Sequence, residues 1–144
     1  MNNINPSIWG RSGWIFLHCI AHAYPDNPSN SDKTTFYKFF ISIKDVLPCE
    51  KCRINYIDHL KMYPLNDKAL SSKNNLIEWF TNIRNASNKE INKPAKTLGE
   101  YQRDMVENVN KTPNYKNMSY FLAIIIALLL IILSVLVCKN YFKH

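Results

Sequence analysis

The stretch of sequence that decides the fold class is SNSDKTTFYKFFISIKDVL, at positions 29–47. It opens with residues that favour a helix N-cap. Its large apolar residues then recur at the spacing of one helical face: Phe36, Phe39, Phe40, Ile43 and Leu47. Comparable patterns predict four more helices, at residues 7–23, 49–62, 72–87 and 98–108. No segment keeps the alternation of a strand, so the sequence predicts an all-α fold built as a compact bundle.

A second segment, MSYFLAIIIALLLIILSVLV at positions 118–137, has no charged residue and no proline. A helix of about 20 apolar residues can span the hydrocarbon core of a membrane, so we expect a C-terminal anchor here. The expected organisation is a helical domain, a linker, a transmembrane helix and a short basic tail, at residues 1–109, 110–117, 118–138 and 139–144. An anchor with so short a tail is typical of proteins whose preceding domain stays in the cytosol.

The composition excludes several classes of protein. The chain has 144 residues and a net charge of +7, but its lysines are spread singly, which indicates a solvated surface and no nucleic-acid partner. Its 3 glycines are too scattered for a glycine-rich nucleotide-binding loop. Its 4 cysteines are too few for a disulfide-rich scaffold.

The sharpest chemical feature is the segment Pro48-Cys49-Glu50-Lys51-Cys52, at the start of the third expected helix. Two residues between the cysteines put both sulfurs on one side of the first helical turn, where they can form a disulfide or share a metal ion. The helix N-terminus favours a thiolate, which a redox-active pair requires. The spacing therefore favours redox chemistry and leaves half of a zinc site open as the alternative.

The zinc alternative needs two more ligands, which His18 and His22 could supply because they stand one helical turn apart. The chain would then be a non-enzymatic, membrane-anchored helical module with a Cys2His2 site, acting as an assembly scaffold. A thioredoxin fold is excluded, since no βαβ pattern surrounds the cysteine pair. Cys19 lies in an apolar helix and is expected to be a buried, inert thiol.

Three blocks of the sequence resemble the Erv/ALR family of FAD-linked sulfhydryl oxidases. The first carries the residues of the GRxxW, LH and YP signature: Gly10, Arg11, Trp14, Leu17, His18, Tyr24 and Pro25. The second is the pair Cys49 and Cys52. The third matches the pattern of a Trp followed by HNxVNxxLxKP at Trp79, Asn85, Asn88, Lys93 and Pro94. It departs from that pattern at Arg84, Ser87 and Asn92, which replace the usual His, Val and Gly, and the family's extra shuttle pair of cysteines is missing.

The resemblance implies a four-helix bundle with a short fifth helix, non-covalently bound FAD and a homodimer, with no resident metal. It implies contacts to FAD from residues that match the pattern: Gly10, Arg11, Trp14, His18, Tyr24, Asn85, Asn88 and Lys93. Arg84, which departs from the pattern, is expected to contact the cofactor as a cation. In the family the second cysteine lies next to the flavin. This implies that Cys52 passes electrons to FAD and that Cys49 is attacked by the substrate.

The function implied by the resemblance is a thiol oxidase that forms disulfide bonds in partner proteins and passes the electrons to O2, giving H2O2. Its partners would be protein dithiols, among them a small thioredoxin-like or CxxC-bearing shuttle protein. The short, single-domain form resembles the oxidases of large DNA viruses. The expected location is therefore a virion membrane or the host endoplasmic reticulum membrane, with the catalytic domain facing the cytosol.

Overall fold

The structure is a computed structural model that describes residues 3–110 and 115–141, and the exposure of the side chains of residues 3–107 and 120–135. The chain divides into two compact units, at residues 1–105 and 106–144. All regular secondary structure in the described residues is helical. This confirms the all-α fold class.

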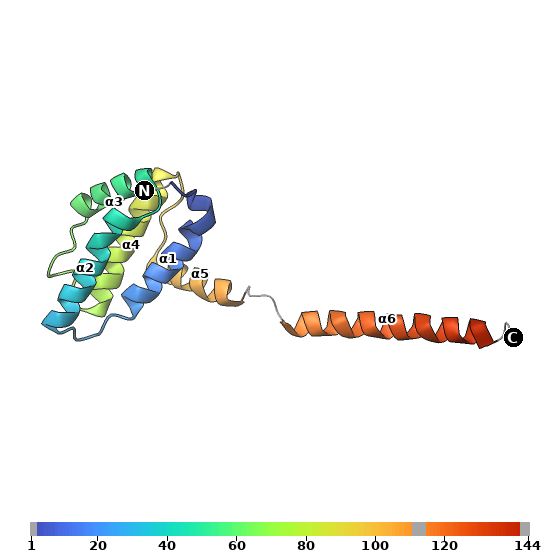
Figure 1. Ribbon diagram of the computed structural model, residues 1–144. Coiled ribbons are helices and arrows are strands. Elements are labelled where there is room, and N and C mark those ends of the chain that lie inside the picture. The colour runs from blue at the N-terminus through green and yellow to red at the C-terminus, as the bar shows by residue number, and fades with distance from the viewer. Residues whose placement is uncertain (1–2, 111–114, 142–144) are drawn as a thin grey trace. The chain divides into compact units, whose positions relative to one another are not determined.

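The first unit contains four complete helices and the start of a fifth (Figure 1). Their bounds are α1 (Pro6–His22), α2 (Asn30–Val46), α3 (Glu50–Met62), α4 (Lys73–Glu90) and α5 (Leu98–Asn110). Helix α4 packs against both α1 and α3, and α3 also packs against α2, lying across the end of α2 in Figure 1. Each helix begins within two residues of the position expected from the sequence.

Capping side chains explain why the helix starts are readable in the sequence. A helix leaves its first backbone N–H groups without partners, and side-chain oxygens satisfy them. Asn5 accepts a hydrogen bond from the backbone N–H of Ser7 (3.0 Å) at the start of α1. Ser29 and Asp32 form a reciprocal capping box at the start of α2. These local contacts set the beginnings of both helices.

Helix α4 ends at Glu90, three residues later than expected (90 against 87), just before a turn at Asn92 with φ of 53°. Glycine adopts this left-handed conformation freely, and asparagine tolerates it better than most other residues do. Asn92 therefore preserves the turn after α4 although it replaces the family's usual Gly.

The core of the first unit is rich in aromatic rings. Phe40, Leu76, Phe80 and Ile83 are fully buried. The ring of Phe40 lies 5.4 Å from that of Phe80 and 5.2 Å from that of Trp79, between centroids, as packed aromatic side chains do. Because full burial of one Phe side chain contributes roughly 1.5–3 kcal/mol, this cluster holds α2 and α4 together.

Cys19 is a free thiol on the exposed side of α1, so the expectation of a buried thiol is wrong. The buried residues of α1 are His18 and Ala21. Cys19 follows His18 by one position, which is about 100° around a helix of 3.6 residues per turn. The same helical geometry that buries His18 therefore turns Cys19 outward.

The second unit contains α6 (Tyr115–Tyr141), which includes the apolar segment. Its side chains from residues 120–135 are exposed. Within the described residues, no helix combines the length and the apolarity that a membrane crossing requires. Both ends of the expected span, 118–138, lie outside the residues whose side chains the structure describes.

Candidate active site

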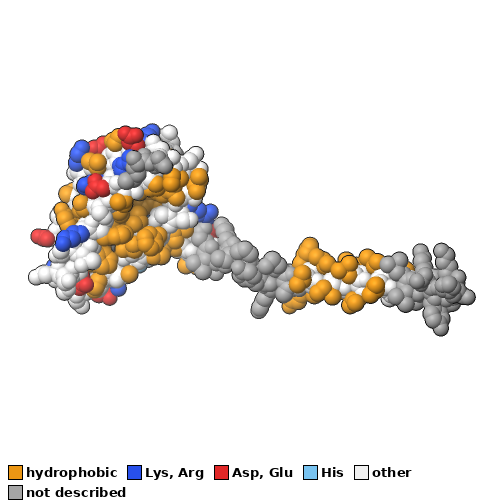
Figure 2. All heavy atoms as spheres, viewed as in Figure 1, with side chains coloured by type: hydrophobic (Ala, Val, Ile, Leu, Met, Phe, Trp, Pro, Cys, Tyr) orange, Lys and Arg blue, Asp and Glu red, His pale blue; other side chains and the backbone are white. Residues whose placement is uncertain are grey.

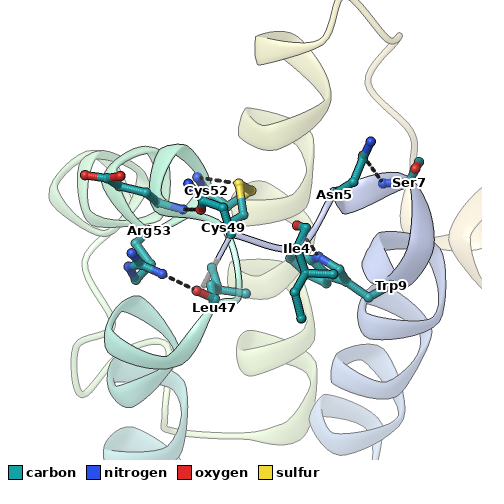
Figure 3. Close-up of a disulfide and its surroundings, with 10 residues drawn as sticks. Ile4, Asn5, Ser7, Trp9, Leu47, Cys49, Cys52 and Arg53 are labelled. Atoms are coloured by element: carbon teal, nitrogen blue, oxygen red, sulfur yellow. Dashed lines mark hydrogen bonds between the residues drawn. A yellow bond between two sulfur atoms is a disulfide. The ribbon is translucent and has the colours of Figure 1, made fainter. Parts of the chain in front are cut away.

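The two cysteines form a disulfide at the start of α3 (Figure 3). Their Cα atoms lie 5.1 Å apart, within the usual range for a disulfide. Cys49 is the N-cap of α3, and its sulfur accepts a hydrogen bond from the backbone N–H of Cys52 at 3.2 Å. The helix N-terminus therefore stabilises negative charge on the Cys49 sulfur once the disulfide is reduced.

The loop before the disulfide is held from several sides, as Figure 3 shows in part. Three hydrogen bonds hold it: the Ile4 N–H to the Pro48 carbonyl (2.7 Å), the Arg53 guanidinium to the Leu47 carbonyl (2.6 Å) and the Glu50 N–H to the Asn3 side-chain oxygen (2.7 Å). No local sequence pattern points to Asn3, because its partner lies 47 residues away in the chain. Asn3 thus caps α3 together with Cys49.

The disulfide lies on the wall of a cavity of about 370 Å³. Helices α1 to α4 all contribute to its lining, which includes Trp9, Gly10, Trp14, Cys49, Cys52 and Ser87. Figure 2 shows hydrophobic side chains gathering over α1 and α2 on the face in view. The volume is that of a small-molecule site, typically about 300–1,000 Å³. A ligand can therefore be held directly against the disulfide.

Trp14 also belongs to a neighbouring cluster with His18, Arg84 and Tyr101. The guanidinium carbon of Arg84 lies 5.3 Å from the ring centre of Trp14 and 4.5 Å from that of Tyr101, which are cation–π distances. The ring of His18 lies 5.0 Å from that of Tyr101. The cluster places a positive charge between two aromatic faces, beside the cavity.

The buried polar atoms of this cluster include several without hydrogen-bond partners. Burial, with a smaller effect from Arg84 and His22, lowers the pKa of His18 from 6.5 to about 3, so the imidazole stays neutral. Within the described structure neither ring nitrogen of His18 has a hydrogen-bond partner, and Nε of Arg84 has none either. Buried polar atoms are rarely left in this state. They mark positions where a ligand's polar atoms can bind.

Asn85 and Asn88, both on α4, hold the chain that follows that helix. Asn85 forms two hydrogen bonds with the backbone of Lys96 (2.9 Å each) and accepts one from the Tyr101 hydroxyl (2.7 Å). Asn88 donates to the same hydroxyl (3.0 Å) and to the Pro94 carbonyl (3.2 Å). The two asparagines therefore position Tyr101. Tyr101 could not be selected from the sequence, because nothing but its aromatic ring in a short helix points to a role in the site.

The structure does not place every residue that was expected to contact FAD beside the cavity. Tyr24 is fully buried, and its hydroxyl donates to the carbonyl of Leu70 at 2.8 Å. Lys93 is exposed after the end of α4, and Arg11 is exposed on α1. Gly10 and Trp14 share the cavity with both cysteines, whereas Tyr24 belongs to the core.

The zinc alternative finds no support in the site. Both of its cysteines are joined in a disulfide. Among the residues that the structure describes, no three His, Cys, Asp or Glu side chains come together as metal ligands do. His18 and His22 do stand one helical turn apart on α1. Neither belongs to a set of three possible metal ligands among the described residues.

Comparison with known proteins agrees with this geometry. The model of the Erv1/Alr family matches residues 11–122, a span that includes the disulfide and all of α4. This chain belongs to the Erv1/Alr family. A relative from Acanthamoeba polyphaga mimivirus, named a probable FAD-linked sulfhydryl oxidase, is 44% identical over 118 residues, which cover 82% of this chain and 80% of that protein. Another, from Invertebrate iridescent virus 3 and named for the same activity, is 35% identical over 104 residues, covering 70% of each chain.

Among solved structures, the Erv1/Alr chain resembles the crystal structure of the yeast Erv1 core. The TM-score is 0.62 at 23% sequence identity, covering 73% of this chain and 86% of that chain. At this identity the likeness establishes the fold alone. It confirms that the helical core expected from the sequence blocks is present.

The residues of this Erv1/Alr site fit a flavin dinucleotide. Such a cofactor needs aromatic faces for its rings, positive groups for its phosphates and hydrogen-bonding groups for its ring nitrogens. Trp14 and Tyr101 offer the aromatic faces, Arg84 a cation, and His18 two buried nitrogens without partners. Gly10, on the cavity wall, has no side chain to fill the space beside the disulfide.

Proposed function

We propose that this chain is an FAD-linked sulfhydryl oxidase, which oxidises pairs of thiols to disulfides and passes the electrons to O2, forming H2O2. One observation carries this conclusion: the Cys49–Cys52 disulfide lies on the wall of a ligand-sized cavity in a member of the Erv1/Alr family. The viral relatives described above are named for this activity.

The disulfide exchanges with a substrate dithiol in two steps. A substrate thiolate attacks Sγ of Cys49, a bond forms between these two sulfurs, and Cys52 leaves as a thiolate with the electron pair. The second substrate thiolate then attacks the substrate sulfur of the mixed disulfide and expels Cys49. As the N-cap of α3, Cys49 is a stabilised thiolate and hence a good leaving group in the second step. The assignment of Cys49 to the substrate and of Cys52 to the cofactor follows the family's pattern.

Bound FAD would supply the acceptor for the electron pair of the cysteines and the donor to O2. We assign its contacts to nine residues: Gly10, Arg11, Trp14, His18, Tyr24, Arg84, Asn85, Asn88 and Lys93. The cavity wall and the buried, unpartnered nitrogens support Gly10, Trp14, His18 and Arg84 in this role. The remaining five rest on the family's sequence pattern.

The proposed substrates are protein dithiols, among them a small thioredoxin-like or CxxC-bearing shuttle protein. The proposed assembly is a homodimer. Its support is the apolar outer face of α1, where Ile8 is 76% exposed and Phe16 is 61% exposed. These two residues stand eight positions apart, about 80° around the helix, so both can belong to one broad apolar stripe.

The segment 118–138 is proposed as a membrane anchor, with the catalytic domain on the cytosolic side of a viral or host endoplasmic reticulum membrane. Its support is the uncharged run at 118–137 and the exposure of the apolar side chains over residues 120–135. Apolar side chains in such number favour a lipid environment over water.

The purified chain tests the proposed function directly. It should be yellow, and heating should release a compound with flavin fluorescence, because the cofactor is held without a covalent bond. Dithiothreitol should drive O2 consumption with formation of H2O2, and Cys49→Ser and Cys52→Ser should both abolish it. Cys19→Ser, at the exposed free cysteine, is the matched control and should keep full activity. A colourless protein with stoichiometric zinc would contradict the proposal.

A further inference from the structure

His59 is a buried titratable residue that the disulfide exchange does not use. It lies on α3, and its side chain is 4% exposed. Its Nδ1 lies 3.4 Å from Oγ of Ser87, and its Nε2 lies 3.8 Å from Oε1 of Glu90. The Glu90 side chain is 48% exposed. Three polar side chains therefore lead from solvent, through a buried imidazole, to the hydroxyl of Ser87.

This set of side chains reaches the redox cavity. Ser87 and Glu90 both line the cavity, together with Cys49 and Cys52. Ser87 stands where the sequence pattern of the family has Val, so the pattern does not account for its hydroxyl. Nε2 of His59 has no hydrogen-bond partner in the described structure, and at 3.8 Å the Glu90 carboxylate attracts it without bonding to it. A small movement of either side chain closes that gap.

The surroundings keep His59 neutral at neutral pH. Burial lowers the pKa of His59, and the carboxylates of Glu90 and Asp58 oppose that effect without overcoming it. Glu90 acts from α4 and Asp58 from His59's own helix. A neutral imidazole has one nitrogen that donates and one that accepts, so it can take up a proton on one side and release one on the other.

We propose that Glu90, His59 and Ser87 form a proton path along the wall of the redox cavity, from the solvent-exposed Glu90 carboxylate through the buried imidazole to the Ser87 hydroxyl. This inference rests on the proposed function. Oxidation of a dithiol breaks two S–H bonds, forms one S–S bond and releases two electrons and two protons. O2 becomes H2O2 by taking up two electrons and two protons. The electrons travel through the cysteines and the bound FAD, while the substrate thiols release their two protons to solvent as they ionise to the attacking thiolates.

Along this path, protons reach the part of the cavity wall where Ser87 lies. Nε2 of His59 receives a proton from the Glu90 side, Nδ1 passes one to Ser87, and the Ser87 hydroxyl releases its own proton into the cavity. His59 is thus a positioning residue that acts through Ser87.

Three variants interrupt this path at successive points with little change in volume: Ser87→Ala, His59→Asn and Glu90→Gln. The full chain loaded with FAD is reduced without oxygen by dithiothreitol and then mixed with O2 in a stopped-flow instrument, in H2O and in D2O. Reoxidation should slow by roughly 10- to 100-fold in Ser87→Ala and His59→Asn, toward the lower end of what a positioned proton donor contributes. The solvent isotope effect should rise, because proton transfer becomes limiting.

Reduction by dithiothreitol should be unchanged in all three variants, because disulfide exchange does not use the path. Ser42→Ala is the matched control, since the Ser42 hydroxyl donates to the Phe39 carbonyl on the exposed side of α2. Ser87→Thr keeps a hydroxyl at the same place and should restore the reoxidation that Ser87→Ala loses.

A second readout needs neither FAD nor turnover. An NMR pH titration of the cofactor-free chain follows the His59 ring, whose signals are identified by their loss in His59→Asn. Glu90→Gln removes a carboxylate that favours the charged imidazole, so the pKa of His59 should fall further below 6.5.

The outcomes separate this inference from the proposed function. If Ser87→Ala and His59→Asn bind FAD and reoxidise at the unaltered rate, the proton path is overturned and the oxidase activity stands. A His59 pKa that does not respond to Glu90→Gln also overturns the path, since the two side chains are then not coupled. An unaltered chain that binds no FAD and oxidises no thiol contradicts the proposed function itself.

Discussion

The position of one sulfur relative to one helix end controls the reactivity of the disulfide. Cys49 is the N-cap of α3, and the N–H of Cys52 points at its sulfur. Cys52 lies within the first turn of α3, so its sulfur is not at the N-cap position. A thiolate at a helix N-terminus persists to lower pH than a free thiol, which ionises at about pH 8.5. The two cysteines are therefore chemically different although only two residues separate them.

This difference predicts the alkylation behaviour of Cys49. In the reduced Cys52→Ser variant, Cys49 should react with iodoacetamide well below pH 8.5, because its thiolate is stabilised by the helix. Mass spectrometry of the modified peptide measures the rate at each pH. The exposed Cys19 of the same molecule lies within α1, away from a helix N-terminus, and is the internal control. Identical pH profiles for the two residues would contradict the capping argument.

His18 makes a second prediction, for stability against pH. Burial holds the pKa of His18 at about 3 in the folded chain, against 6.5 for an ordinary imidazole. As the pH falls through 6.5 the unfolded chain binds a proton that the folded chain does not, so stability falls progressively until the pH nears 3. Urea unfolding of the cofactor-free chain at several pH values should show a shallower fall for His18→Gln. Equal slopes for the two chains would show that His18 is not the cause.

At the scale of an element, the start of α3 carries two caps, from Cys49 and from Asn3. Loss of a capping side chain typically costs about 1 kcal/mol of stability. Asn3→Ala should therefore lower the unfolding free energy by about that amount, measured from the urea midpoint. Asn27→Ala, in the exposed loop between α1 and α2, is the control and should change it little. An Asn3→Ala chain as stable as the control would show that the Asn3 contact adds nothing.

The elements show what sequence reasoning could reach and where it stopped. The starts of α1 and α2 depend on caps made by residues two or three positions away, so the local pattern was enough. The cysteine pair and the family's sequence blocks also located the site, because they too are patterns of residues that stand close together in the chain. The role of Asn3 depends on a contact 47 residues away, which no local pattern encodes. His59 was missed because its partners, Ser87 and Glu90, lie on another helix.

For the whole molecule, the proposed anchor predicts how the chain behaves toward a membrane. Residues 118–137 contain no charge, so in cells the full chain should stay with membranes after washing with high salt or alkaline carbonate. Immunoblotting of pellet and supernatant checks this. Replacing Leu129 and Leu130 by Asp should release the chain, because a charge at the centre of a span costs roughly 2.5–3.5 kcal/mol per residue. Release of the unaltered chain by carbonate would rule out a spanning segment.

The central claim is that Cys49 and Cys52 exchange electrons with FAD, and the absorption spectra of two single variants test it most directly. Cys49→Ser leaves a lone Cys52 sulfur next to the cofactor, and its thiolate beside oxidised FAD should give a broad long-wavelength charge-transfer band. Acid should bleach the band as the thiolate takes up a proton. Cys52→Ser should lack the band, and both variants should lose turnover. A band in Cys52→Ser instead would reverse the roles of the two sulfurs, and full oxidase activity in either variant would contradict the account.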